Sequence, residues 1–243
     1  MIVEKVIGIG NTAEAYLLED DKILKLFYTG YPKEAVEREY YNAKVIEDLG
    51  FAKPKAHNLI EQDKRNGIIY DRIEGESLLQ WVLKSSNIEA CAEHMAKLHK
   101  SILSNRISGV QSYKDFLKFH IEMAKRLSLN EREKALELLD KLPEGDTLCH
   151  GDFHPGNILM SEAPTVIDFM NICRGNYLYD IARTVFLIEY TPVSGDFSDK
   201  EKLMWLKREL ANLYLENMKV TRDMIRDYLS VISVARAGEC PDE

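Results

Sequence analysis

The sequence predicts an α+β fold in which a small antiparallel sheet is followed by a larger, mainly helical region. Short apolar and β-branched runs, separated by turns, fill the first third of the 243-residue chain. Beyond them, apolar residues recur mostly at helical spacing. The polar stretch Glu74-Gly75-Glu76 separates the two patterns. We therefore expect two domains, a smaller one over residues 1–73 and a larger one over residues 74–243.

The first domain is expected to hold a meander of strands and one helix. The apolar runs that predict strands lie at residues 2–9, 13–18, 23–27 and 67–73. A turn of small residues from Gly8 to Thr12 and a second turn at Asp20-Asp21 connect the first three. Apolar residues at helical spacing predict a helix over residues 33–49, with Gly50 as its C-cap.

The second domain is expected to be built from amphipathic helices around a few short strands. Helices are predicted at residues 88–102, 113–127, 178–189, 200–216 and 222–235. Asn130 and Glu133 resemble a capping box that opens one more helix, which ends before Pro143. Short strands are predicted at residues 147–149, 157–160 and 165–168. We interpret His94 and His99 as ordinary members of an amphipathic helix.

Composition limits the partners of the chain. There are 40 acidic and 32 basic residues, giving a formal charge of −8. Nucleic acid is not an expected partner, because affinity for it comes mainly from Lys and Arg on phosphates. A negative chain would suit a cationic small molecule, although negative charge also serves solubility. The sequence does not set an oligomeric state.

The expected compartment is the cytoplasm. The four cysteines form no CxxC pair and read as free thiols in a reducing environment. The N-terminal residues lack a signal-peptide pattern, and no apolar run is long enough to span a bilayer. We therefore expect no membrane partner.

Polar residues gather in one central loop. Asp152, His154 and Asn157 lie between two short apolar segments, and a following apolar strand ends in Asp168. An acidic residue at a strand end beside a polar loop is well placed to bind a cation through oxygen. Mg²⁺ prefers one or two carboxylates together with phosphate oxygens and water.

The sequence H-G-D-F-H-P-G-N-I-L at residues 150–159, with V-I-D-F at 166–169 and D-I-A at 180–182, resembles the aminoglycoside phosphotransferase and choline kinase superfamily. These proteins are relatives of the protein kinases. The resemblance implies a bilobal protein-kinase-like fold, with a small antiparallel-sheet N-lobe and a larger helical C-lobe. It further implies transfer of the γ-phosphate of ATP, with GTP as another option, to a hydroxyl of a small molecule such as an aminoglycoside-like compound, an amino-alcohol or a sugar.

The resemblance also implies a role for individual residues. Asp152 would orient or deprotonate the acceptor hydroxyl, while Asn157 and Asp168 would bind Mg²⁺. Lys25 would contact the α- and β-phosphates, and Glu39 would pair with Lys25 and hold it in place. Such groups supply the positioning and charge neutralisation that phosphoryl transfer requires.

Two backbone segments would complete the nucleotide site in this interpretation. The turn from Gly8 to Thr12 would cover the phosphates, and the backbone from Tyr70 to Ile73 would hydrogen-bond the adenine. The residues assigned in this way to nucleotide binding are Gly8, Gly10, Asn11, Thr12, Tyr70, Asp71 and Ile73. His150 is expected to pack the central loop by hydrogen bonds, and Asp180 to anchor it through backbone amides or to cap its own helix.

Other interpretations of the same residues are weaker. Cys149, His150 and His154 have no fourth zinc ligand at metal-site spacing. The turn at Gly8 also fits a dinucleotide-binding fingerprint, but the required helix and acidic strand end do not follow it. A protein kinase of the same fold is an alternative, although only about ten residues separate Asp168 from the next predicted helix, too few for an extended activation segment. A non-catalytic nucleotide-binding regulator is a second alternative.

The motif residues depart from the family pattern at two places. Met170 stands where related enzymes often carry an acidic residue, and Gly175-Asn176-Tyr177 replaces a common Gly-Asp-Pro. The resemblance therefore defines the reaction but does not name the acceptor.

Overall fold

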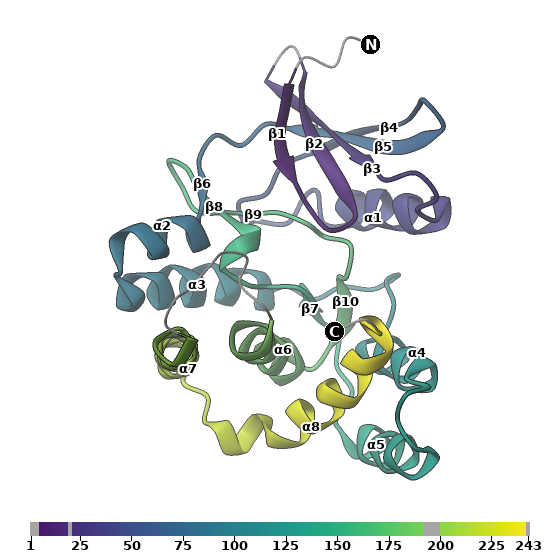
Figure 1. Ribbon diagram of the computed structural model, residues 1–243, viewed down its shortest axis with the longest axis vertical. Helices are drawn as coiled ribbons and strands as arrows, with labels where there is room; N and C mark the ends of the chain where they lie inside the picture. Colours follow the sequence, from purple (N-terminus) through teal and green to yellow (C-terminus); the bar gives the residue numbers. More distant parts are fainter. Residues whose placement is uncertain (1–4, 19–20, 192–199, 242–243) are drawn as a thin grey trace. The chain divides into compact units, whose positions relative to one another are not determined.

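The computed structural model describes residues 5–18, 21–191 and 200–241, and Figure 1 traces its helices and strands. The chain forms two compact units. One comprises Met1–Ser77 with Ile158–Asn171, and the other comprises Leu78–Asn157 with Ile172–Glu243. The predicted domain boundary between residues 73 and 74 stays a prediction.

A five-stranded antiparallel sheet forms most of the first unit. Its strands are β1 (Lys5–Ile9), β2 (Ala13–Leu18), β3 (Lys22–Phe27), β4 (Ala56–Gln62) and β5 (Arg65–Asp71), in the order β1-β2-β3-β5-β4. Strand β4 was not predicted. Its central residues, from His57 to Glu61, are exposed or half-buried, so the strand contains no long apolar run.

Helix α1 (Lys33–Val45) packs on one face of this sheet. Val36 and Ala43 pack there with Phe27, Ile68 and Tyr70 in one buried cluster. The predicted end of this helix at residue 49, with Gly50 as its cap, is wrong. After Val45 the hydrogen bonds tighten from the α-helical spacing to turns, in which the Glu47 N–H donates to the Lys44 carbonyl and the Leu49 N–H to the Ile46 carbonyl.

The first unit also holds a small three-stranded sheet. It consists of β6 (Glu76–Ser77), β8 (Ile158–Met160) and β9 (Thr165–Val166), in the order β6-β8-β9. The predicted strand at residues 165–168 is too long, because the backbone of Asp168 takes a positive φ of 67°. The strand expected from residue 157 starts one residue later, since Asn157 belongs to the 3-10 turn η1 (Pro155–Asn157).

The second unit is mainly helical. Its helices are α2 (Leu78–Ser85), α3 (Ile88–Leu103), α4 (Tyr113–Met123), α5 (Leu129–Lys141), α6 (Tyr177–Tyr190), α7 (Lys200–Met218) and α8 (Arg222–Glu239). Strands β7 (Thr147–Cys149) and β10 (Cys173–Gly175) pair antiparallel. Helix α2 was not predicted, and α4 is shorter than the predicted 113–127. The two structural units together confirm the α+β class.

The capping box of α5 lies two residues before the predicted one. Ser128 Oγ accepts from the Glu131 N–H, and the Glu131 carboxylate accepts from the Ser128 N–H. Asn130 and Glu133 share the same spacing, but Ser128 has the extended backbone that an N-cap requires. The local motif was therefore recognised correctly but assigned to the wrong pair.

Helix α6 forms the centre of the second unit. Every residue from Tyr179 to Ile188 is buried, because α6 packs against α7, α8 and β7 (Figure 1). Asp180 and Arg183 are among these buried residues. Because buried charges need partners, α6 requires polar groups from its neighbours at these two positions.

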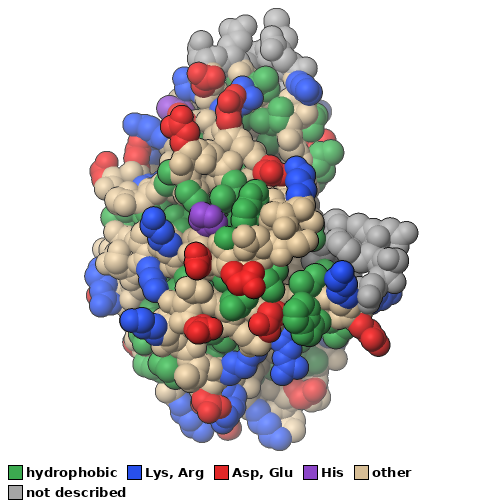
Figure 2. Space-filling model, turned by 90° about the vertical axis from the view of Figure 1, so that its left-hand side faces the viewer, with side chains coloured by type: hydrophobic (Ala, Val, Ile, Leu, Met, Phe, Trp, Pro, Cys, Tyr) green, Lys and Arg blue, Asp and Glu red, His purple; other side chains and the backbone are tan. Residues whose placement is uncertain are grey.

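The surface carries both signs of charge. On the face shown in Figure 2, acidic and basic side chains are interspersed between small apolar areas. Among the described residues, no helix is both long and apolar enough to cross a membrane.

Gly238 tests the close packing of α8 on α4. A Cβ atom at Gly238 would lie 1.9 Å from the His120 carbonyl oxygen, so Gly238→Ala must push the two helices apart. Although alanine is the better helix former, we expect this variant to lose about 1–3 kcal/mol in the free energy of unfolding. Urea denaturation measures the loss.

Gly50→Ala is the matched control for this prediction. A Cβ atom there meets nothing within 4 Å, so its free energy of unfolding should change by less than about 0.5 kcal/mol. Equal stability of Gly238→Ala and the wild type would contradict the close packing.

Candidate active site

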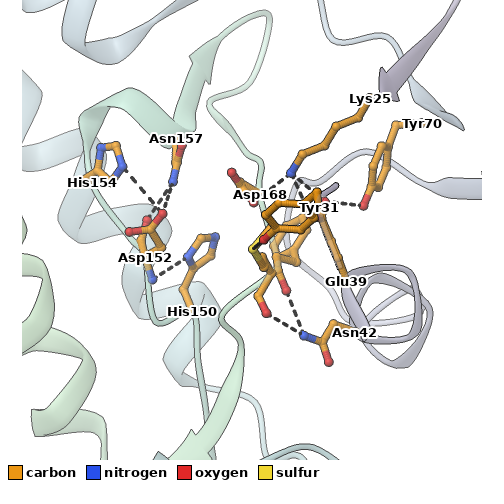
Figure 3. Close-up of polar contacts among 12 residues, drawn as sticks. Lys25, Tyr31, Glu39, Asn42, Tyr70, His150, Asp152, His154, Asn157 and Asp168 are labelled. Carbon is orange, nitrogen blue, oxygen red and sulfur yellow. Dashed lines mark hydrogen bonds and ion pairs between the residues drawn. The ribbon is translucent and has the colours of Figure 1, made fainter. Parts of the chain in front are cut away.

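Lys25 is the centre of a charged cluster in the first unit. The alternation of β3 places Lys25 on the same face as Phe27, toward α1, while Leu24 and Leu26 form a separate cluster. Lys25 Nζ lies 2.8 and 2.9 Å from the two carboxylate oxygens of Glu39 on α1. It also lies 3.1 Å from Asp168 Oδ1. Figure 3 shows the lysine pointing between these two carboxylates.

The cluster keeps Lys25 positively charged. Burial alone would lower the pKa of Lys25, but the carboxylates of Asp168 and Glu39 outweigh it and raise that pKa. Burial raises the pKa of Glu39, and the neighbouring Lys25 offsets only part of this rise. Tyr70 donates to Glu39 Oε1 at 2.9 Å, and burial raises the pKa of this phenol, which therefore stays a neutral donor. A fixed cation of this kind can bind phosphate oxygens.

The segment after Asp168 is held by α1. Asn42 is buried, and its Nδ2 donates to the carbonyl oxygens of Phe169 and Met170, both at 3.1 Å. Tyr31 Oη donates to Met170 Sδ at 3.2 Å. Asp168 has the left-handed backbone that few residues other than Gly, Asn and Asp adopt readily. Figure 3 shows Asn42 reaching this segment from α1, while Glu39 on the same helix points to Lys25 and Tyr70.

Asp152 and Asn157 meet in the loop of the second unit. Asn157 Nδ2 donates to the Asp152 carbonyl at 3.0 Å and to Asp152 Oδ2 at 3.1 Å. His154 Nε2 lies 4.0 Å from the same carboxylate oxygen, and His154 Nδ1 accepts from the Gly156 N–H. The side chain of Asp152 is 27% exposed, so a bound molecule can reach it. Figure 3 shows Asn157 turning its amide nitrogen toward Asp152.

The backbone before Asp152 is anchored by Asp180. The carboxylate of Asp180 accepts from the N–H of His150 at 2.6 Å and from the N–H of Gly151 at 2.8 Å. This confirms the expectation that Asp180 anchors the loop through backbone amides. His150 is buried, and its Nδ1 accepts from the Asp152 N–H at 3.2 Å, which confirms its packing role.

Asp180 is itself supported by His99. Burial would raise the pKa of Asp180, but the hydrogen bond from His99 and the backbone donors lower it overall. His99 Nε2 lies 2.9 Å from Asp180 Oδ2, and His99 Nδ1 lies 2.6 Å from Tyr214 Oη. The interpretation of His99 as an unremarkable helix residue is therefore wrong. The available signal was a histidine on the apolar stripe of its helix, with Met95 and Ile102.

Sequence reasoning also missed Arg183. Its Nε donates to the carbonyl of Gly151, directly before Asp152. The signal was a single basic residue inside the apolar run of α6.

The turn expected to cover the phosphates is ordered by local hydrogen bonds. The Gly10 N–H donates to the Ala13 carbonyl at 2.9 Å, and Tyr28 Oη donates to the Gly10 carbonyl at 2.9 Å. The Thr12 carbonyl accepts from the Tyr28 N–H. An irregularity in strand pairing falls just before Gly8, and Asn11 lies in the turn itself. The phosphate role of this turn stays a prediction.

The segment expected to contact adenine lies at the end of β5. Tyr70 directs its hydroxyl to Glu39, and the Asp71 N–H donates to the Lys55 carbonyl. Asp71 Oδ1 lies 2.6 Å from His57 Nε2. Ile73 follows the strand. The adenine contacts also stay a prediction.

The donor chemistry of the predicted metal ligands fits Mg²⁺. Asp168 offers a carboxylate and Asn157 an amide oxygen, and both are the hard oxygen donors that Mg²⁺ accepts beside phosphate and water. Lys25 and Asp168 lie in the first unit, and Asp152 and Asn157 lie in the second. The roles of these residues stay predictions.

Comparison with known proteins identifies the family. The sequence profile of the phosphotransferase enzyme family matches residues 4–201, so the chain belongs to this family and is a phosphotransferase. Among curated proteins, none matches the chain.

Solved structures confirm the fold. The apo form of a thermostable mutant of aminoglycoside phosphotransferase APH(4)-Ia is 15% identical, with a TM-score of 0.71 over 98% of this chain and 87% of that one. Aminoglycoside-3'-phosphotransferase of type VIII is also 15% identical, with a TM-score of 0.66 over 96% and 92%. APH(3'')-Id from Streptomyces rimosus, in complex with ADP and streptomycin, is 16% identical, with a TM-score of 0.63 over 91% and 90%. The predicted resemblance is thereby confirmed.

The lowered pKa of Asp180 predicts a pH-dependent stability. A carboxylate whose pKa is lower in the folded state stabilises the fold above its ordinary pKa of about 4 and loses this contribution as the pH falls through the folded value. We expect the free energy of unfolding of Asp180→Asn to be about 3–5 kcal/mol below that of the wild type at pH 7, and this difference to be smaller in acid.

Unfolding free energies from pH 3 to pH 8 measure this gap. Asp140→Asn, an exposed change on α5, should follow the wild type throughout. A gap for Asp180→Asn that widens toward acid would contradict the assignment.

Proposed function

We propose that this phosphotransferase moves the γ-phosphate of ATP to a hydroxyl of a small molecule, with Mg²⁺. The observation that carries the proposal is the contact of Lys25 with both Glu39 and Asp168. A buried lysine that pairs with a helix carboxylate is suited to the phosphates of a nucleotide. Relatives of the same fold were solved with AMP-PNP and hygromycin B and with ADP and streptomycin.

In this proposal the first unit binds the nucleotide. Lys25 contacts the α- and β-phosphates, and Glu39 fixes the direction of the lysine chain. The turn at residues 8–12 covers the phosphates. Asp168 and Asn157 would hold Mg²⁺, which would neutralise phosphate charge.

Asp152 acts on the acceptor. Its carboxylate takes the proton of the attacking hydroxyl as the acceptor oxygen bonds to the γ-phosphorus. The bond from this phosphorus to the bridging oxygen of ADP breaks, and ADP leaves with that electron pair. Asn157, which donates to Asp152 Oδ2, keeps the carboxylate in one direction.

The acceptor is proposed to be a cationic molecule rich in hydroxyl groups. Relatives of this fold bind hygromycin B or streptomycin, and the net charge of −8 favours a cation. We place the reaction in the cytoplasm, in keeping with four cysteines that form no disulfide with one another. A protein acceptor, or nucleotide binding without transfer, is less favoured because the chain belongs to the phosphotransferase family.

Replacing Asp152 tests the reaction. Wild-type protein with Mg²⁺ and ATP should release ADP when supplied with an acceptor from a panel of aminoglycosides, choline, amino-alcohols and sugars. Asp152→Asn should lower this rate by about 100-fold or more, because it removes the proton acceptor, while its affinity for ATP stays unchanged.

Asp115→Asn, an exposed aspartate on α4, serves as the control and should keep full activity. Full turnover by Asp152→Asn would show that Asp152 is not the proton acceptor. Phosphorylation of a protein, with no compound of the panel phosphorylated, would contradict the small-molecule acceptor.

Replacing Glu39 tests the nucleotide site separately. Glu39→Gln keeps the shape of the side chain but removes the charge that holds Lys25. We expect kcat/KM for ATP to fall between about 10- and 100-fold, or roughly 1.4–2.8 kcal/mol, with KM for the acceptor unchanged.

Glu37→Gln is the matched control, because Glu37 lies two residues away on the same helix with its side chain 51% exposed. If both variants kept the wild-type kcat/KM for ATP, the carboxylate of Glu39 would not be required to position Lys25 for ATP.

A further inference from the structure

Arg183 is an unusual residue for the centre of a packed helix. Its side chain is only 1% exposed, and it follows Asp180 by one turn of α6. Removing a guanidinium from water is unfavourable unless its donors find partners. An apolar side chain could fill the same space without this cost. The role of Arg183 must therefore lie in the contacts that its guanidinium makes.

Those contacts point in two directions. Arg183 Nε donates to the carbonyl oxygen of Gly151, and Arg183 Nη2 donates to Glu239 Oε1 near the end of α8. The guanidinium carbon also lies 5.1 Å from the centroid of the Phe116 ring. Glu239 is 14% exposed and also lies 3.5 Å from Arg236 Nη1. One end of the guanidinium is therefore held by a carboxylate while the other holds the loop.

The carbonyl that Arg183 binds belongs to the peptide unit between Gly151 and Asp152. The N–H of the same peptide unit donates to His150 Nδ1. The preceding peptide groups donate to Asp180. The backbone leading to Asp152 is thus fixed at successive groups, and Gly151 adopts a left-handed φ of 75° to allow it. The orientation of this last peptide determines where the Asp152 side chain begins.

The charges agree with this geometry. Burial would lower the pKa of Arg183, but Glu239, Tyr179 and Asp152 together outweigh it and raise that pKa. Burial would raise the pKa of Glu239, but Arg183 lowers it overall. Both groups are ionised, so the pair keeps a directed donor at the Gly151 carbonyl.

We propose that Arg183 is a positioning residue for Asp152, and that Glu239 on α8 acts through Arg183 by fixing its guanidinium. This rests on the proposed function only for its kinetic consequence. Asp180 and Arg183 lie one turn apart on α6. Asp180 binds backbone amides of the loop, and Arg183 binds a backbone carbonyl of the same loop. Helix α8 contributes Glu239, which binds Arg183.

Kinetics of two variants test the consequence. Arg183→Met should lower kcat by about 10- to 100-fold with little change in KM for ATP or the acceptor, because a displaced general base harms only the chemical step. Glu239→Gln should give a smaller loss of kcat. The double variant should be no slower than Arg183→Met alone, because Glu239 acts only through the arginine.

Another ion pair between the same helices provides the control. Arg222 on α8 lies 2.6 Å from Glu189 on α6, away from the loop. Arg222→Met should lose stability while keeping the wild-type kcat. If Arg222→Met lowered kcat as much as Arg183→Met, or if the Arg183 and Glu239 losses multiplied in the double variant, the positioning role would be wrong.

Hydrogen exchange tests the same inference without any acceptor. In Arg183→Met the backbone amides of the loop at residues 150–157 should exchange faster than in the wild type, and in Arg222→Met they should not. Unchanged exchange in Arg183→Met overturns the inference even for an inactive protein. A wild type that phosphorylates no acceptor, with faster loop exchange in Arg183→Met, contradicts the proposed function alone.

Discussion

The buried carboxylate of Asp180 is the interaction on which the candidate active site depends. It lies in the most deeply buried helix of the second unit and accepts from the backbone amides of His150 and Gly151. Since water cannot replace these partners inside the core, the loop before Asp152 has one stable backbone path. His99 satisfies the same carboxylate from α3 and ties it to Tyr214 on α7. The backbone that leads to Asp152 is in this way a part of the core.

In the first unit, a single helix positions the polar residues of the candidate site. Helix α1 packs its apolar face on the sheet and presents Glu39 and Asn42, three residues apart, toward the polar segments. Glu39 directs Lys25, and Asn42 holds the backbone that follows Asp168. Helix α1 therefore positions both the ammonium group of Lys25 and the segment that carries Asp168, the predicted metal ligand. Phosphoryl transfer places its main demand on such positioning, since the protein itself supplies little covalent chemistry.

Local patterns predicted much of this structure. Strand β2 and the short strand β7 have the predicted limits, and α1 starts at the predicted Lys33, because apolar periodicity and turn residues are local signals. Strand β4 was missed because it lacks a continuous apolar run, and α2 was missed because its eight residues are too few to show helical periodicity. The motif around Asp152 and the pairing of Lys25 with Glu39 came from resemblance to a family. The sequence marks His99 and Arg183 as polar residues on apolar helix faces, but it does not show their partners, which lie 81 and 32 residues away in the chain. The contacts of these two side chains form only when α3, α6 and α8 pack together in the folded protein.

The transfer of phosphate to a small molecule is tested most directly by following the phosphorus atom itself. Wild-type protein is incubated with Mg²⁺, γ-labelled ATP and the acceptor panel, and molecules of low mass are then separated from protein. We expect the label to move to one class of hydroxyl-bearing acceptor, and chelation of Mg²⁺ to stop this transfer. Label that accumulates on protein, or only as free phosphate with every acceptor, would contradict it.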